Sequence, residues 1–146
     1  MAITSAICNS FKVEILKAVH DFTASSGNTF KLALYTSSAT LNKSTTAYST
    51  SNEITNTSGS AYTAGGKALT SVTPVLSTDT AVCDFADISF TSASFTANGC
   101  LIYNDSATGD PAVCAIAFGS DKTVTSGTFT IQFPTADASD AIIRIA

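Results

Sequence analysis

From residue 67 onward, short runs of apolar and β-branched residues alternate with turn residues at intervals of roughly 8–12 residues. Within one such run, Phe129, Ile131 and Phe133 are separated by Thr130 and Gln132. A period of two belongs to a strand that buries one of its faces. The sequence therefore predicts a mainly β fold, an antiparallel β-sandwich or barrel-like domain of about seven or eight strands.

Composition supports this fold class and excludes others. Ser and Thr account for 43 of the 146 residues, whereas charged residues make up only 12%. A coiled coil or a solvated helical bundle needs many more charged surface pairs than this chain provides. The hydrophobic content of 45% and the mean hydropathy of +0.27 exclude a disordered chain. The length fits a single domain, 1–146, in which a strand at 29–36 joins a β core at 67–146.

Local patterns divide the β region further. Residues 29–36 alternate in the manner of a half-exposed strand, with Phe30, Leu32 and Leu34 on one face. Asn98-Gly99 is the strongest short hairpin signal in the chain. Ser126-Gly127 predicts a second turn.

The first part of the chain has a different hydrophobic period, because its apolar residues recur at three- and four-residue steps. This spacing predicts one N-terminal α-helix over residues 5–22, and Thr4, Ser5 and Asn9 are candidate caps. We expect the helix to cover an open edge or face of a sheet, with docking against another subunit as the alternative. The residues of its apolar stripe are Ile7, Phe11, Ile15, Leu16, Val19 and Phe22.

Residues 37–66 form a long segment that is dominated by Ser, Thr, Asn and Gly. Irregular segments of this length are uncommon in compact domains and tend to be functional arms or disordered. Leu41, Tyr48, Ile54 and Tyr62 are spaced along it like anchors. We predict an extended polar arm that is held on a surface, either its own or a neighbour's; a flexible segment is the alternative.

Charge and cysteine usage exclude several kinds of partner and cofactor. The net charge is −4 and the seven basic residues do not cluster, so we expect no nucleic-acid binding. No apolar run approaches the roughly 20 residues that cross a bilayer, so we expect no membrane association. The first residues lack the features of a secretory signal, which favours folding in a cytoplasm.

The four cysteines and the single histidine lack metal-ligand spacing, so neither a metal nor a cofactor is expected. In a reducing compartment, disulfides are also disfavoured. We expect Cys83, Cys100 and Cys114, each in an apolar run, to be buried free thiols.

The sequence also gives little support for catalysis. His20 would have to serve any histidine-dependent mechanism by itself, and we interpret it as a surface or capping residue. Gly65-Gly66-Lys67 is followed by Ala68, where a phosphate-binding loop needs Ser or Thr. The acids of the loop at 104–111 lack the alternate spacing of a calcium loop. We therefore predict that the chain is not an enzyme and name no catalytic residue.

Five stretches, taken in their order and spacing, carry a resemblance to a known class of proteins. The chain resembles the short β-rich virion structural proteins of tailed bacteriophages. An N-terminal helix followed by a lysine-bearing strand also fits this class, so the resemblance covers nearly the whole chain. The stretches are 31–36 (KLALYT), 62–69 (YTAGGKAL), 101–105 (LIYND), 118–121 (FGSD) and 127–133 (GTFTIQF).

The resemblance implies a subunit of the virion, assembled in the host cytoplasm. Its most economical form is a capsid decoration or cement protein, often trimeric, that binds the major capsid protein on the outer lattice and stabilises the particle. One alternative is a neck, tail or fibre component that binds other virion proteins or the host surface. Another is a free-standing module, either a carbohydrate-binding domain or an unrecognised enzyme.

Seven residues are predicted contacts with other subunits or with the capsid. They lie on the expected helix and on the arm, where they also have a plainer interpretation as solvated charges or as anchors of the arm to its own domain. They are Phe11, Lys12, Lys17, His20, Tyr48, Glu53 and Tyr62.

Overall fold

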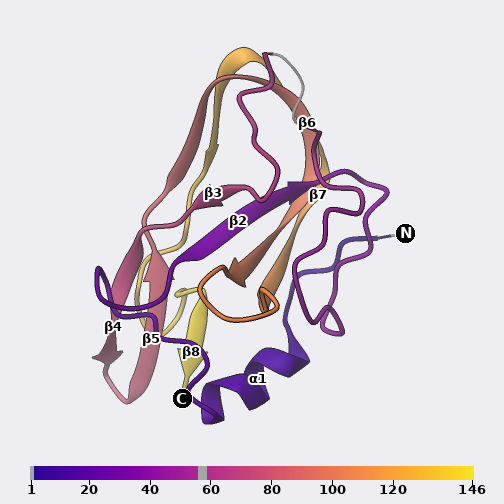
Figure 1. Ribbon diagram of the computed structural model, residues 1–146. Helices are drawn as coiled ribbons and strands as arrows, with labels where there is room; N and C mark the ends of the chain where they lie inside the picture. Colours follow the sequence, from indigo (N-terminus) through magenta and orange to yellow (C-terminus); the bar gives the residue numbers. More distant parts are fainter. Residues whose placement is uncertain (1, 56–58) are drawn as a thin grey trace.

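The computed structural model describes residues 2–55 and 59–146, and its fold is mainly β, as predicted (Figure 1). Within these residues the strands form two antiparallel sheets, of order β1-β7-β6-β2-β3 and β4-β5-β8, and neither sheet closes into a barrel. The elements are β1 (Ala6–Ile7), α1 (Asn9–Leu16), β2 (Phe30–Tyr35), β3 (Lys67–Ala68), β4 (Ser71–Ser77), β5 (Thr80–Phe85), β6 (Ile88–Asn104), β7 (Ala112–Ile131) and β8 (Ile143–Ile145).

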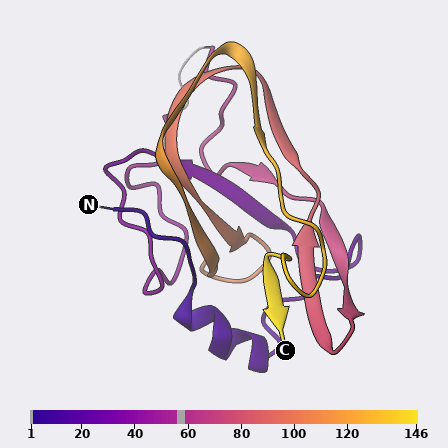
Figure 2. The ribbon, with the colours of Figure 1, turned by 180° about the vertical axis from the view of Figure 1, so that it is seen from behind.

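The two longest strands, β6 and β7, run together and bend over one end of the molecule (Figures 1 and 2). Their register shifts where the sequence predicted turns. The hairpin expected at Asn98-Gly99 and the turn expected at Ser126-Gly127 are therefore wrong, because both pairs lie inside paired strands. Bulges and turns favour the same residue types. The connecting loop lies instead between Asn104 and Ala112.

Strand β2 is buried on both faces and is not half-exposed as its alternation suggested. Only Lys31 of its six residues is partly accessible. One edge of β2 pairs with β6 along the whole strand, and the other edge pairs with β3 and with residues 52–54 of the polar segment. There the N–H of Ile54 donates to the carbonyl of Leu34 at 2.9 Å. Part of this edge is thus paired with a segment whose composition gave no sign of strand structure.

The core joins the two sheets through packed aromatic rings. Phe22 and Phe30 stack with ring centroids 4.2 Å apart, and Phe85 of the three-stranded sheet lies 5.9 Å from Phe30. Such pairs add about 0.5–1.5 kcal/mol to the free energy gained by burial alone. All four cysteines are buried and none forms a disulfide, which confirms the prediction for Cys83, Cys100 and Cys114.

The N-terminal helix is shorter than the expected 5–22. Ala6 and Ile7 pair with Ala115 and Cys114 of β7, so the segment before Asn9 is a strand. The helix ends at Leu16 and Ala18 adopts a left-handed φ of 58°, which reverses the chain. None of the three candidate caps is used, since Cys8 occupies the N-cap position without a side-chain bond.

The residues of the predicted apolar stripe differ in burial, because Phe11 is buried whereas Leu16 faces solvent. Among the described residues no helix has both the length and the apolarity needed to cross a bilayer.

We expect Gly66→Ala to destabilise the protein by at least about 2 kcal/mol more than Gly109→Ala. Both glycines have left-handed backbone, with φ of 79° and 84°, so both variants carry the same intrinsic strain of about 1 kcal/mol. A Cβ at residue 66 would also collide with the Leu32 carbonyl, whereas residue 109 faces open space. Urea unfolding measures the difference, and equal losses in the two variants would contradict this packing.

Candidate functional site

A buried carboxylate holds the polar arm to the domain. Glu53 is 7% exposed and accepts three hydrogen bonds from the arm itself. Its oxygens lie 2.6 Å from the hydroxyls of Tyr48 and Tyr62 and 2.7 Å from the backbone nitrogen of Gly65. The Tyr62 hydroxyl in turn accepts the N–H of Leu34 at 2.9 Å. The arm is therefore tied both to itself and to the edge of β2.

The remaining tyrosines strengthen the same attachment. Tyr35 donates to the carbonyl of Ser49 at 2.7 Å, and Tyr103 donates to the carbonyl of Gly65 at 2.6 Å. The rings of Tyr48 and Tyr103 stack with centroids 4.6 Å apart. All four tyrosines of the chain thus bind the arm to the five-stranded sheet.

All four phenols act as hydrogen-bond donors in this cluster. Burial is the main cause that raises the pKa of Tyr62, and its bond to the Glu53 carboxylate adds to the rise. Burial also leads the rise in the pKa of Tyr35, Tyr48 and Tyr103. The raised pKa values keep the phenols protonated, so each can donate the hydrogen bond that holds the arm.

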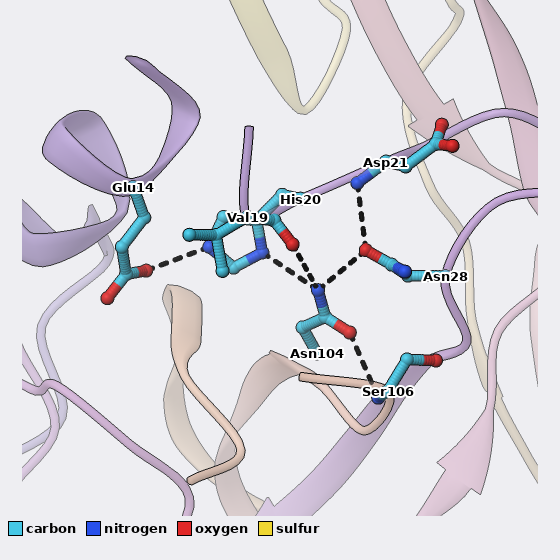
Figure 3. Close-up of polar contacts among 7 residues, drawn as sticks. All are labelled: Glu14, Val19, His20, Asp21, Asn28, Asn104 and Ser106. Atoms are coloured by element: carbon cyan, nitrogen blue, oxygen red, sulfur yellow. Dashed lines mark hydrogen bonds and ion pairs between the residues drawn. The ribbon is translucent and has the colours of Figure 1, made fainter. Parts of the chain in front are cut away.

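A second polar cluster surrounds His20 (Figure 3). Its Nε2 lies 2.8 Å from the Glu14 carboxylate, and its Nδ1 lies 3.1 Å from the side-chain nitrogen of Asn104. The same nitrogen donates to Oδ1 of Asn28 at 2.9 Å, and this oxygen also accepts the N–H of Asp21. The Asn104 side-chain nitrogen also lies 3.3 Å from the carbonyl of Val19, so its two hydrogens face three acceptors.

This arrangement joins three segments that are distant in sequence. Glu14 lies on α1, Asn28 precedes β2, and Asn104 ends β6. The His20 side chain is completely buried, with the Phe11 ring 4.9 Å away. Because both ring nitrogens already have partners, the imidazole is placed to fix the segment after α1 against the domain. The interpretation of His20 as a surface or capping residue is wrong.

A small apolar pocket of about 130 Å³ lies beside His20. Pockets for small molecules usually measure about 300–1,000 Å³, so this one has room for a single aliphatic side chain. Burial, with a smaller effect from Asp84, raises the pKa of its one thiol, that of Cys83, to about 12, which keeps the sulfur protonated and unreactive. The lining residues are Ile15, His20, Phe22, Pro74, Ala81, Val82, Cys83, Ile143 and Ile145.

In the part of the chain that the structure describes, no three His, Cys, Asp or Glu side chains are grouped to hold a metal ion. The loop at 104–111 instead uses one of its acids in a surface ion pair, with Asp105 lying 3.0 Å from Lys31.

The structure separates the seven predicted contact residues into two groups. As contacts with other subunits, Phe11, Glu53 and Tyr62 are wrong because they are buried, and so is the His20 side chain. On the arm, the alternative interpretation as anchors to its own domain describes Glu53, Tyr62 and the half-buried Tyr48. Lys12 and Lys17 are exposed on or next to α1.

No sequence pattern indicated that Asn104, in the second cluster, and Asp84, outside both clusters, would be buried. Asn104 and Asp84 are buried polar residues at strand ends, at 0% and 2% exposure. Asn and Asp are common turn formers, so neither stood out from the polar residues around it. The role of Asn104 depends on groups that are distant in the sequence. The raised pKa of Asp84 depends on its burial.

Comparisons with protein-family models, with curated proteins and with solved structures find no match to this chain.

We expect Tyr62→Phe to lower the free energy of unfolding by about 2–4 kcal/mol, because it leaves the buried Glu53 carboxylate and the Leu34 N–H each short of a partner. Tyr103→Phe is the matched control. It removes one partly buried bond and should cost about 0.5–1.5 kcal/mol. Urea unfolding at unchanged m-value provides the measurement. Similar losses in the two variants would show that Glu53 is not the centre of the attachment.

Asp84 is a buried carboxylate with an incomplete set of partners. One oxygen accepts the N–H of Phe85 at 2.8 Å, whereas Oδ2 is buried without a hydrogen-bond partner. Burial raises the pKa of Asp84 above its ordinary 3.8, and the charge of Asp87 adds to the rise. The folded state therefore favours the protonated acid, and this contribution to stability is lost as the pH rises above about 4 toward the folded-state pKa.

We expect Asp84→Asn to stabilise the protein by about 1 kcal/mol at pH 7, since the amide keeps the bond from Phe85 without a buried charge. The advantage should shrink as the pH falls toward 4. Asp140→Asn, at an exposed site, should leave stability within about 0.5 kcal/mol. Thermal unfolding as a function of pH tests this, and a gain that does not depend on pH would contradict it.

Proposed function

We propose that this chain is a structural subunit of a bacteriophage virion, and specifically a capsid decoration protein that binds the outer lattice and stabilises the particle. The order and spacing of its strand segments, which resemble those of short β-rich virion proteins, support this proposal. Binding energy that is gained only in the assembled shell stabilises that shell by mass action.

The observation that carries the proposal is the outer edge of β7. Within the described residues, β1 pairs only with Cys114 and Ala115, and no strand pairs with the outer edge of β7 beyond them. The remaining stretch, 118–131, presents unpaired backbone groups on a mostly exposed ribbon. A long open edge is a template for strand addition by a partner protein.

The side chains along this edge are suited to close contact with a large surface. Thr123, Thr125 and Thr128 are exposed and uncharged, so a partner can cover them without the cost of desolvating charges. Asp121 and Lys122 are the charged residues of the stretch and carry opposite signs. The arm is a weaker candidate for strand addition, because several of its described backbone groups already pair with β2, with the N-terminal segment and with Pro111.

The bound particle provides the test. We expect Thr125→Lys to weaken co-sedimentation of the protein with purified phage shells at least tenfold, since a charge on the edge discourages strand addition. Thr135→Lys, at an exposed site outside β7, should bind as the wild type does. Binding that is unaffected by both substitutions would exclude the β7 edge as the contact.

Copy number in purified virions separates the shell from the other virion parts. A decoration protein should be present in a fixed ratio to the major capsid protein, whereas a neck or tail component should occur in a few copies per particle. Quantified protein gels of the virion measure this ratio, and absence of the chain from virions would exclude the proposed function.

A further inference from the structure

The large apolar side chains that face solvent gather at one end of the molecule. The six that the described residues contain lie on α1, β4 and β8, at the end opposite the bend of β6 and β7 (Figures 1 and 2). Leu16 is the most exposed, at 88%, followed by Leu76 at 70%. Val72 and Val75 stand on the opposite face of β4 from Leu76. We call the surface formed by Val13, Leu16, Leu76 and Ile145 the apolar end.

Strand register makes part of this surface continuous. Leu76 pairs with Ala81, and Ala81 pairs with Ile145, so the three side chains stand in one row across the three-stranded sheet. Ile145 also lines the 130 Å³ pocket beside Ile15 of α1. The pocket thus opens between the sheet and the helix that carries Leu16, and it has room for one aliphatic side chain.

Charges of opposite sign flank the apolar end. Lys12 and Lys17 are exposed and lie four residues from Leu16 and Val13 respectively, so on the helix surface each is a neighbour of an exposed apolar side chain. Asp79 is exposed in the β4–β5 turn, on the other side of β8 from α1 (Figure 1). A surface with a basic side, an apolar centre and an acidic side is complementary to itself under a two-fold rotation.

We propose that the apolar end binds a second copy of this chain. In the two-fold pair, Leu16 of each copy enters the pocket of the other, and Lys12 and Lys17 face Asp79 of the other copy. An aliphatic anchor in a pocket with a charged rim is the usual arrangement of a binding hot spot. The interface lies away from the β7 edge, and the proposal does not depend on the proposed function. The decoration proteins that the chain resembles are often trimers, whereas this interface pairs two copies.

Sedimentation equilibrium from about 1 to 100 μM tests the pairing. We expect the wild-type chain to form dimers in this range and Leu16→Asp to remain monomeric, with dimer affinity lowered at least tenfold. Leu16 is exposed, so its replacement should leave thermal unfolding unchanged. Ser38→Asp, an exposed site on the arm, is the matched control and should dimerise as the wild type does.

A charge swap then tests the orientation of the pair. Lys17→Glu should weaken dimerisation, and adding Asp79→Lys should restore part of the loss, because the two charges would again be opposite across the interface. A wild type that stays monomeric throughout the range, or a Leu16→Asp variant that dimerises normally, would overturn the proposal. A wild-type trimer, or a swap that restores nothing, would overturn the two-fold arrangement.

Discussion

The attachment of the arm depends on one buried carboxylate. Glu53 is nearly inaccessible to water, and an ionised group in that position is tolerable only when hydrogen bonds replace its hydration. Two tyrosine hydroxyls and one backbone N–H supply those bonds. Because Tyr62 also accepts from Leu34, the same network closes the edge of β2. The arm thereby pairs with an edge of β2 that would otherwise be open to other chains.

The two polar clusters explain how a small domain with one short helix holds its irregular segments. Glu53 fixes the arm, and the His20–Asn104 pair fixes the chain between α1 and β2. Both clusters are satisfied internally, which suits a scaffold. The two surfaces proposed to bind partners, the open edge of β7 and the apolar end around Leu16, lie outside both clusters.

Sequence patterns predicted the fold class because they are local. Alternating residues such as Phe129 and Ile131 identify strands whichever sheet they join. Local patterns were wrong where bulges and turns use the same residues, as at Asn98-Gly99, and where both faces of an alternating strand are buried, as on β2. The helix was predicted too long because Ile7 continues the apolar period although its backbone pairs with β7. For the candidate site, the sequence indicated Tyr48 and Tyr62 as anchors, and it gave no sign of Asn104.

The sequence by itself determined that this chain is a mainly β domain with buried thiols, since apolar spacing and turn composition are properties of neighbouring residues. The tertiary structure alone decided which polar residues are buried, which strand edges stay open and where the exposed apolar side chains meet. These features arise from contacts between segments far apart in the chain, such as Glu53 with Gly65 or His20 with Asn104. No local period encodes such contacts, because their energy appears only when the whole domain has excluded water from them.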